Sequence, residues 1–171
     1  MGNINQPEVW LRGPLINMPP LLQPVAHALL QAREELNALM ESFDEGYLWQ
    51  PVAGMASAGF HLQHLTGVLN RLFTYARNEG LTEEQLDYLK EEGKPTTKVY
   101  TSAQLVKNFN QEVEAALRQL SQEVEDRLTD FRGVGRQQLP STLIGLYTHA
   151  AEHTMRHLGQ LIVTVNVLKH S

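Results

Sequence analysis

The sequence predicts an all-α protein built as a four-helix bundle, and three observations support this fold class. Four long stretches carry apolar residues at three- and four-residue spacing, which is the periodicity of an amphipathic helix. The sequence shows neither a sustained alternation of apolar and polar residues nor an Asn-Gly or Asp-Gly turn between β-branched runs. Its length of 171 residues fits one domain, so we expect residues 1–171 to fold around a single core.

The first two predicted helices span about residues 21–43 and 57–78. In the first, Pro24 falls within the opening turn, where the missing N–H of proline costs little. The second has Ser57 as a candidate N-cap and Gly80 as a candidate terminator. The apolar stripes of these helices consist of Val25, Leu29, Leu36, Leu39, Met40 and Phe43, and of Leu62, Leu65, Leu69, Leu72 and Phe73.

The third and fourth predicted helices span about residues 101–128 and 142–169. Thr101 and Gln104 fit the capping-box pattern, in which each side chain binds the free backbone N–H of the other residue. Ser141 is the expected start of the fourth helix. The apolar stripes consist of Leu105, Phe109, Val113, Ala116, Leu117, Leu120 and Val124, and of Leu146, Ala150, Leu158, Leu161 and Val165.

Three connections separate these helices, at residues 45–56, 81–100 and 129–140. With about 12, 20 and 12 residues they are longer than tight helical hairpins, so we expect one or more to cross over or to line a site. In the second connection, Leu86, Tyr88 and Leu89 suggest a short additional helix.

The composition excludes several classes of protein. The chain has no cysteine, which excludes disulfides, thiolate metal sites, iron–sulfur clusters and a cysteine nucleophile. Its formal net charge of −5 argues against a nucleic-acid partner. Because the sequence contains neither an apolar run of about 18 residues nor a basic leader with an apolar core, we expect a soluble, cytoplasmic protein without a membrane partner.

Five of the seven histidines lie in two of the predicted helices, and this clustering is the strongest chemical signal in the sequence. Residues four apart lie one turn apart on one helix face, so His153 and His157 could bind one metal ion, and so could His149 and His153. His149 and His157 lie about 12 Å apart along the axis, too far to share an ion with bonds of about 2.0–2.1 Å. A third ligand must come from the other helix, from either His61 or His64, which periodicity does not separate.

A second pattern in the fourth helix points to a different class of site. His149, Glu152 and His153 match the H-x-x-E-H arrangement of certain zinc peptidases. Such enzymes also need a carboxylate ligand further along the chain, and no residue after His153 is acidic. We therefore interpret Glu152 either as a charge on the helix surface or as a hydrogen-bond partner of a metal-binding imidazole.

Two segments of the sequence are similar to a known family. Residues 59–67 (GFHLQHLTG) and 147–160 (YTHAAEHTMRHLGQ) resemble the second and fourth helices of the DinB/YfiT-like superfamily. The likeness extends over nearly the whole chain in order and spacing, and it includes Trp49-Gln-Pro51 before the second helix. The resemblance implies an up-down-down-up four-helix bundle that binds a divalent metal ion through three histidines.

The same resemblance implies which histidines bind the metal. One ligand comes from the second helix and two come from an H-x-x-x-H pair in the fourth, which correspond here to His64, His153 and His157. His61 would then lie outside the ligand shell, and His149 would be an additional histidine. Three neutral imidazoles suit Zn²⁺, Ni²⁺ or Fe²⁺, and the sequence does not distinguish these ions.

Family members of known activity include thiol-dependent S-transferases and the mycothiol-dependent maleylpyruvate isomerase. The resemblance therefore implies a metal-dependent enzyme that activates a low-molecular-weight thiol for S-transfer, or water for hydrolysis, and acts on a small-molecule substrate. The alternative is a non-catalytic metal-binding or interaction module, and a third reading is a metal-free bundle with a small apolar ligand. Relatives are often dimers, and Leu161, Val165 and Leu168 permit a homodimer. The sequence assigns no catalytic residue.

Several residues are candidates for the surroundings of the site. Gln160, one turn from His157, could hydrogen-bond a ligand or substrate, or could be a surface amide. Tyr47 and Trp49 could form the wall of the site or cover an edge of the core. Arg132 and Arg136 of the third connection could bind the carboxylates of an anionic thiol, or could be solvated surface residues, as such arginines more often are.

Overall fold

The computed structural model describes residues 6–95 and 100–170, and in these ranges the protein is mostly helical, as the sequence predicts. Its α-helices are α1 (Gln23–Met40), α2 (Ala58–Ala76), α3 (Glu83–Glu91), α4 (Ser102–Ser121) and α5 (Leu143–Lys169). Short 3-10 helices span Val9–Arg12, Pro20–Leu22, Glu45–Tyr47 and Glu125–Arg127, and strands β1 (Phe131–Val134) and β2 (Leu139–Thr142) form an antiparallel hairpin. Residues 1–5, where no leader was expected, and residues 96–99 of the predicted second connection lie outside the described residues.

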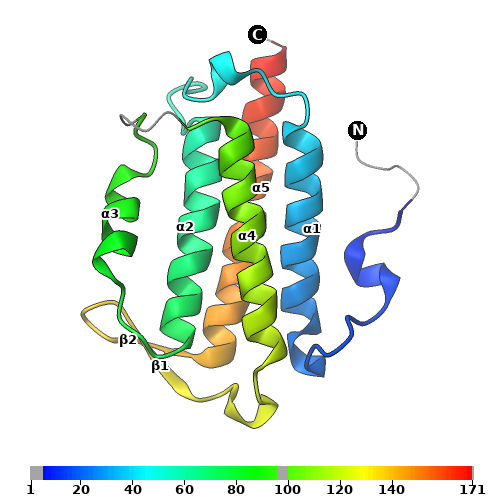
Figure 1. Cartoon of the computed structure of the whole chain (residues 1–171), viewed down its shortest axis with the longest axis vertical. Helices are drawn as coiled ribbons and strands as arrows, with labels where there is room; N and C mark the ends of the chain where they lie inside the picture. Colours follow the sequence, from blue (N-terminus) through cyan, green and yellow to red (C-terminus); the bar gives the residue numbers. More distant parts are fainter. Residues whose placement is uncertain (1–5, 96–99, 171) are drawn as a thin grey trace.

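The four long helices lie side by side (Figure 1). Helix α2 packs against α5 and α4, and α1 packs against the same two helices. In the view of Figure 1, α1 and α5 run upward along the chain, whereas α2 and α4 run downward. The short helix α3 lies on the outer side of α2, in agreement with the additional helix expected in the second connection. The two helices that carry the clustered histidines, α2 and α5, are therefore neighbours.

The apolar stripes of the four long helices meet in one core. Its largest fully buried side chains include Leu29 and Leu36 of α1, Leu62, Leu65 and Leu69 of α2, Leu105, Phe109 and Leu120 of α4, and Leu143, Tyr147 and Leu158 of α5. The expectation of a dimer surface at Leu161, Val165 and Leu168 is wrong, because all three side chains are at most 2% exposed and face the interior. None of the described helices combines the length and apolar character needed to cross a bilayer.

The first two long helices begin where the sequence places them, but α2 ends earlier. Pro24 lies in the first turn of α1, and the Ser57 hydroxyl accepts a hydrogen bond from the Phe60 N–H at 3.2 Å. The last residue of α2 is Ala76, and the left-handed residue that follows is Asn78, with a φ of 63°, rather than Gly80. Asparagine tolerates this conformation better than most residues, which explains why no glycine is needed there.

The start of α4 uses only half of the predicted capping box. The Thr101 hydroxyl accepts from the Gln104 N–H at 3.1 Å, but the Gln104 side chain donates to Asn108 at 2.9 Å instead of reaching back. The carboxylate of Glu45 accepts from the backbone N–H of Ser102 at 2.9 Å and also from its hydroxyl. This acidic residue therefore satisfies a free donor at the positive end of the α4 dipole.

The predicted third helix is too long by about seven residues, since α4 ends at Ser121. Val124 continues the apolar spacing of α4 but is 56% exposed. Leu128 is buried, and it reaches the core from the 3-10 helix Glu125–Arg127 rather than from α4. Apolar spacing alone therefore overestimates the length of this helix, because the 3-10 turn after α4 also brings Leu128 into the interior.

The β1–β2 hairpin was not predicted. Phe131 pairs with Thr142 and Val134 with Leu139, and the turn between them has positive φ angles at Gly135 and Gln138 rather than an Asn-Gly pair. The hairpin leads into α5, whose N-cap is Thr142, one residue after the expected Ser141; its hydroxyl accepts from the Gly145 N–H at 3.1 Å.

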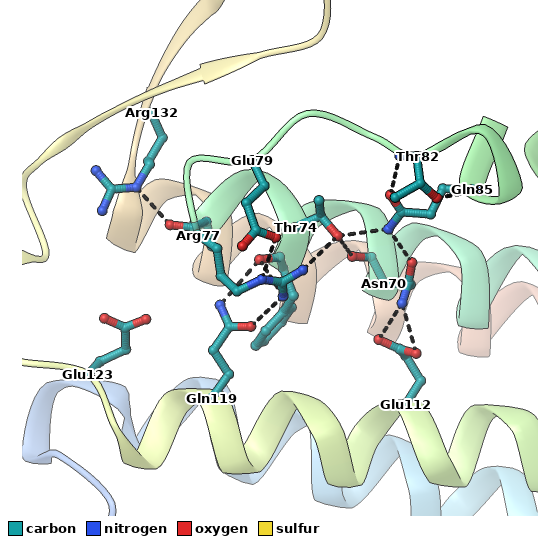
Figure 2. A network of polar contacts seen from close by, with 12 residues as sticks. Asn70, Thr74, Arg77, Glu79, Thr82, Gln85, Glu112, Gln119, Glu123 and Arg132 are labelled. Carbon is teal, nitrogen blue, oxygen red and sulfur yellow. Dashed lines mark hydrogen bonds and ion pairs between the residues drawn. The ribbon is translucent and has the colours of Figure 1, made fainter.

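Arg132 fastens this hairpin to the end of α2. Its side chain is buried, and its Nε donates to the carbonyl of Ala76 at 2.7 Å (Figure 2). Ala76 lies twelve residues beyond His64 on the same helix, which corresponds to about 18 Å along the axis. The expectation that Arg132 holds an anionic thiol beside the histidines is therefore wrong, and Arg136, in the exposed turn of the same hairpin, does not restore it.

A network of polar side chains joins α3 to α2 and α4 (Figure 2). Gln85 of α3 donates its amide to Asn70 Oδ1 at 2.5 Å and to Thr74 Oγ1 at 2.7 Å, both on α2. Asn70 in turn donates to both carboxylate oxygens of Glu112 on α4, at 3.1 Å each. None of the nine residues of α3 is fully buried, so polar contacts such as these hold the helix in place.

Candidate metal centre

The packing of α2 against α5 brings three histidines together. His64, His153 and His157 each offer a ring nitrogen, and these atoms lie within 4.8 Å of one another. The Nε2 atoms of His64 and His153 are 3.0 Å apart, and the ring centroids of His64 and His157 are 4.3 Å apart. Nitrogen ligands of a tetrahedral ion with bonds of about 2.0–2.1 Å lie about 3.3–3.4 Å apart, so the observed spacing suits one shared ion.

The environment keeps two of these imidazoles neutral at neutral pH. Burial, and then the neighbouring His64, lower the pKa of His157 to about 4. Burial and His64 also lower the pKa of His153. A neutral imidazole has an unprotonated nitrogen available for a metal ion, whereas an imidazolium has none. The electrostatics of the group therefore favour the form that binds metal.

Glu92 and Arg71 lie directly behind His64. The Nδ1 of His64 is 2.7 Å from Glu92 Oε2, and Arg71 Nη1 donates to Glu92 Oε1 at 2.7 Å. The side chains of Glu92 and Arg71 are only 5% and 10% exposed. The sequence analysis missed both residues, because neither shares a motif with the histidines and Glu92 is 28 positions away from His64.

His61 lies next to the group but outside it. Its side chain is buried, and its Nδ1 is 3.3 Å from the Nδ1 of His157. Burial, and then the neighbouring His64, lower the pKa of His61 to about 4. Because one nitrogen of each ring faces the other, His157 has its second nitrogen, Nε2, left to offer to a metal ion.

The residues present fit a divalent metal ion of borderline softness. His153 Nδ1 is buried and has no hydrogen-bond partner among the described residues. The group contains three nitrogen donors, and within the described ranges no cysteine, aspartate or glutamate joins it. Three imidazoles hold Zn²⁺ and similar ions and leave further coordination positions for a small ligand. All three side chains are half-buried rather than sealed inside the core, so the site is reachable.

The outer histidine of α5 belongs to a second, exposed group. His149 and Glu152 also lie within ligand distance of His153, but both are exposed. Glu152 pairs with Arg156 and lies 3.4 Å from His149, so it forms part of the outer surface of α5. Of the two readings of Glu152, the structure favours a surface charge. Gln160 is likewise exposed on α5.

Aromatic residues support the site from the start of α2. The ring of Phe60 stacks on that of His64, with centroids 5.2 Å apart and an interplanar angle of 11°. Trp49 packs on Gly59, where an added Cβ would lie 2.5 Å from the Trp49 ring. Trp49 therefore covers the beginning of α2. Of the two roles expected for this residue, it takes that of covering an edge of the core. Tyr47 is half-buried in the short 3-10 helix before it.

One comparison with known proteins identifies the family of the chain. The profile of the DinB superfamily matches residues 28–161, a range that includes all three histidines of the group together with Glu92 and Arg71. A search of curated proteins gave no match. Since the matched range covers most of the 171 residues, the chain belongs to the DinB superfamily.

Proposed function

We propose that this protein is a divalent-metal-binding DinB protein whose 171 residues form a single domain. In this proposal α1, α2, α4 and α5 make the up-down-down-up four-helix bundle of the DinB/YfiT type. The mutual packing of these helices and their directions along the chain support that arrangement. The hairpin and α3 are then additions at its margins.

The proposed ligands are His64, His153 and His157, and the ion is zinc, nickel or iron. The observation that carries the proposal is the convergence of three ring nitrogens from two helices within 4.8 Å of one another. The lowered pKa values of His153 and His157 support it, because both rings then offer unprotonated nitrogen at neutral pH.

The reaction class that we propose is activation of a small thiol for S-transfer, or of water for hydrolysis, on a small-molecule substrate. A divalent ion in this group would supply acidification of a bound thiol or water at an open coordination position. The chain itself would orient the ligand rings and exclude water from one face of His64 through the stacked Phe60 ring. We also propose a cytoplasmic location and a homodimer that does not involve the buried side chains of α5.

A non-catalytic metal-binding or interaction module is the second candidate, and one observation favours it. Three of the ionisable side chains beside the histidines are themselves occupied: Glu92 binds Arg71, His61 faces His157, and Glu152 binds Arg156. An enzyme that needs a general base would then have to draw it from the exposed His149, from the substrate or from the activated ligand.

The metal proposal is tested by measuring metal in protein purified without a polyhistidine tag. Mass spectrometry should find about one divalent ion per chain in the wild type, and His64→Ala and His153→Ala should each lose it. His149→Ala, an exposed neighbour on α5, is the matched control and should retain the ion. Stoichiometric metal that survives both His64→Ala and His153→Ala would overturn the assignment.

Catalysis is tested separately from metal binding. Small thiols are screened against electrophilic substrates, and hydrolysable esters and amides are screened without thiol, before and after chelation. Turnover that disappears on chelation and returns with added metal supports the enzyme. Turnover that is the same before and after chelation rejects the proposed mechanism. Metal-bound protein without any turnover favours the binding module.

A further inference from the structure

The geometry points to Glu92 as a positioning residue of the metal centre: it fixes the proton of His64 on Nδ1, so that an unprotonated Nε2, able to bind a metal ion, faces His153. Arg71 holds Glu92 in this orientation. The inference deepens the proposed function and rests on it for the role of the ion. The position of the proton itself concerns only residues of this chain.

The hydrogen-bonding capacities of the two groups determine the direction of the contact. A carboxylate oxygen only accepts hydrogen bonds, so the 2.7 Å contact between Glu92 Oε2 and His64 Nδ1 requires the proton on Nδ1. In a neutral imidazole the other nitrogen, Nε2, is then unprotonated. That nitrogen lies 3.0 Å from His153 Nε2, on the side where the three rings converge. Partners of this kind, on the nitrogen away from the metal, commonly orient metal-binding histidines.

Arg71 makes the orientation of Glu92 unambiguous. It occupies the second carboxylate oxygen at 2.7 Å, and both side chains are almost fully buried. Gly67 gives the pair its space, since an added Cβ there would collide with the Glu92 carboxylate and the Arg71 guanidinium. Two donors, one from His64 and one from Arg71, therefore share the two oxygens of a single acceptor.

The backbone around Glu92 is held to α2 beside His64. The N–H of Gly93 donates to Gln63 Oε1 at 2.8 Å, and the Tyr88 hydroxyl donates to the Gln63 carbonyl at 3.1 Å. Gly93 has a φ of 79°, a conformation that suits glycine, and a Cβ there would contact the ring of Phe60. The turn that carries Glu92 is thus hydrogen-bonded to Gln63, the residue before His64, and this contact fixes the position of Glu92 beside the histidine.

The alternative is that Glu92 is only a buried ion-pair partner that joins α3 to α2. The two roles differ in what Glu92→Gln does. A glutamine has one acceptor oxygen, and Arg71, which can only donate, would take it. The amide NH₂ would then face His64 Nδ1, which must become an acceptor, so the proton moves to Nε2, the nitrogen needed by the metal. A purely structural role predicts lower stability but no change of tautomer.

The test combines two measurements on the full chain. In metal-free protein labelled with ¹⁵N-histidine, long-range ¹H–¹⁵N correlation spectra report which His64 nitrogen carries the proton. We expect Nδ1–H in the wild type and Nε2–H in Glu92→Gln. Titration with Zn²⁺ alone should show an affinity about 10- to 100-fold weaker in the variant. Glu91→Gln, with the same charge change at the preceding exposed residue, should leave both readings unchanged.

A double variant provides a rescue. Arg71→Met combined with Glu92→Gln removes the competing donor, so the amide oxygen is free to accept from His64, and the Nδ1–H form should return. A wild-type His64 protonated on Nε2, or an unchanged tautomer in Glu92→Gln, would overturn the inference. The wild-type spectrum decides the matter even if the variants do not fold. Wild-type Zn²⁺ affinity in Glu92→Gln would reject the inference alone, whereas absence of Zn²⁺ binding in the wild type would reject the proposed function and leave the tautomer result standing.

Discussion

The Nδ1 of His61 lies 3.3 Å from the Nδ1 of His157, across the interface between α2 and α5. Both rings have a pKa lowered to about 4, mainly because of burial, so both are neutral at neutral pH. In such a pair one ring donates and the other accepts, and a single proton lies between the two nitrogens. His61 is therefore placed to hold Nδ1 of His157, as Glu92 is placed to hold Nδ1 of His64.

Replacement of His61 by alanine should weaken metal binding without abolishing it. The change removes a buried partner of His157 but none of the three converging nitrogens, so we expect one Zn²⁺ per chain with affinity reduced about tenfold. His157→Ala, which removes a proposed ligand, should lose far more. Competition with a chromophoric chelator measures both affinities. If His61→Ala loses Zn²⁺ as completely as His157→Ala, then His61 is itself a ligand.

The metal-free protein should lose stability as the pH falls from about 6.5 toward about 4. An unfolded histidine has a pKa of about 6.5, whereas burial, and then His64, lower the pKa of His61 to about 4 in the folded protein. Between these values the unfolded state binds a proton that the folded state does not, so acid favours unfolding. For His61 the loss between about pH 7.5 and pH 5 is on the order of 1–2 kcal/mol. His157 acts in the same direction.

Urea unfolding of chelator-treated protein at the two pH values checks this expectation. His61→Phe replaces the titrating ring by an apolar one and should reduce the pH-dependent loss. His149→Ala, at an exposed position, should leave it as in the wild type. A loss in His61→Phe equal to that of the wild type would show that another group causes the acid sensitivity.

The long helices and the α5 histidine pair were predictable because both depend on local spacing. Residues three and four apart share a helix face wherever that helix lies, so the separation of His153 and His157 already implies convergence. Spacing could not choose between His61 and His64, because both lie on the α2 face toward α5. Packing separates them: His64 approaches Nε2 of His153, whereas His61 approaches Nδ1 of His157.

Glu92 and Arg71 could not be predicted because their contact with His64 depends on tertiary structure. Glu92 reaches the histidine only because α3 returns along α2 and ends beside it. The same limit applies to the buried Arg132, whose partner, the carbonyl of Ala76, is 56 positions away. Sequence spacing cannot predict such contacts, because no periodicity relates the residues that make them.

Asn70→Ala should destabilise the fold by about 1–3 kcal/mol. Asn70 donates to both oxygens of Glu112, and burial raises the pKa of that carboxyl group. Without the amide, the half-buried carboxylate of Glu112 loses its neutral donor, and Gln85 of α3 loses an acceptor. Urea unfolding measures the effect, with the exposed Asn166→Ala as control. Equal stability of the two variants would mean that the network in Figure 2 contributes little to the fold.

Gly67→Ala should weaken Zn²⁺ binding, although residue 67 is not a proposed ligand. The added methyl group would collide with the Glu92 carboxylate and the Arg71 guanidinium, so the acceptor behind His64 must shift. Gly159→Ala on α5 is the matched control, because nothing lies within 4 Å of its Cβ position. Removing a helical glycine there should stabilise the protein by about 0.5–1 kcal/mol and leave the affinity for Zn²⁺ unchanged. Chelator competition and urea unfolding of both variants separate the two effects, and wild-type affinity in Gly67→Ala would show that the metal centre tolerates displacement of Glu92.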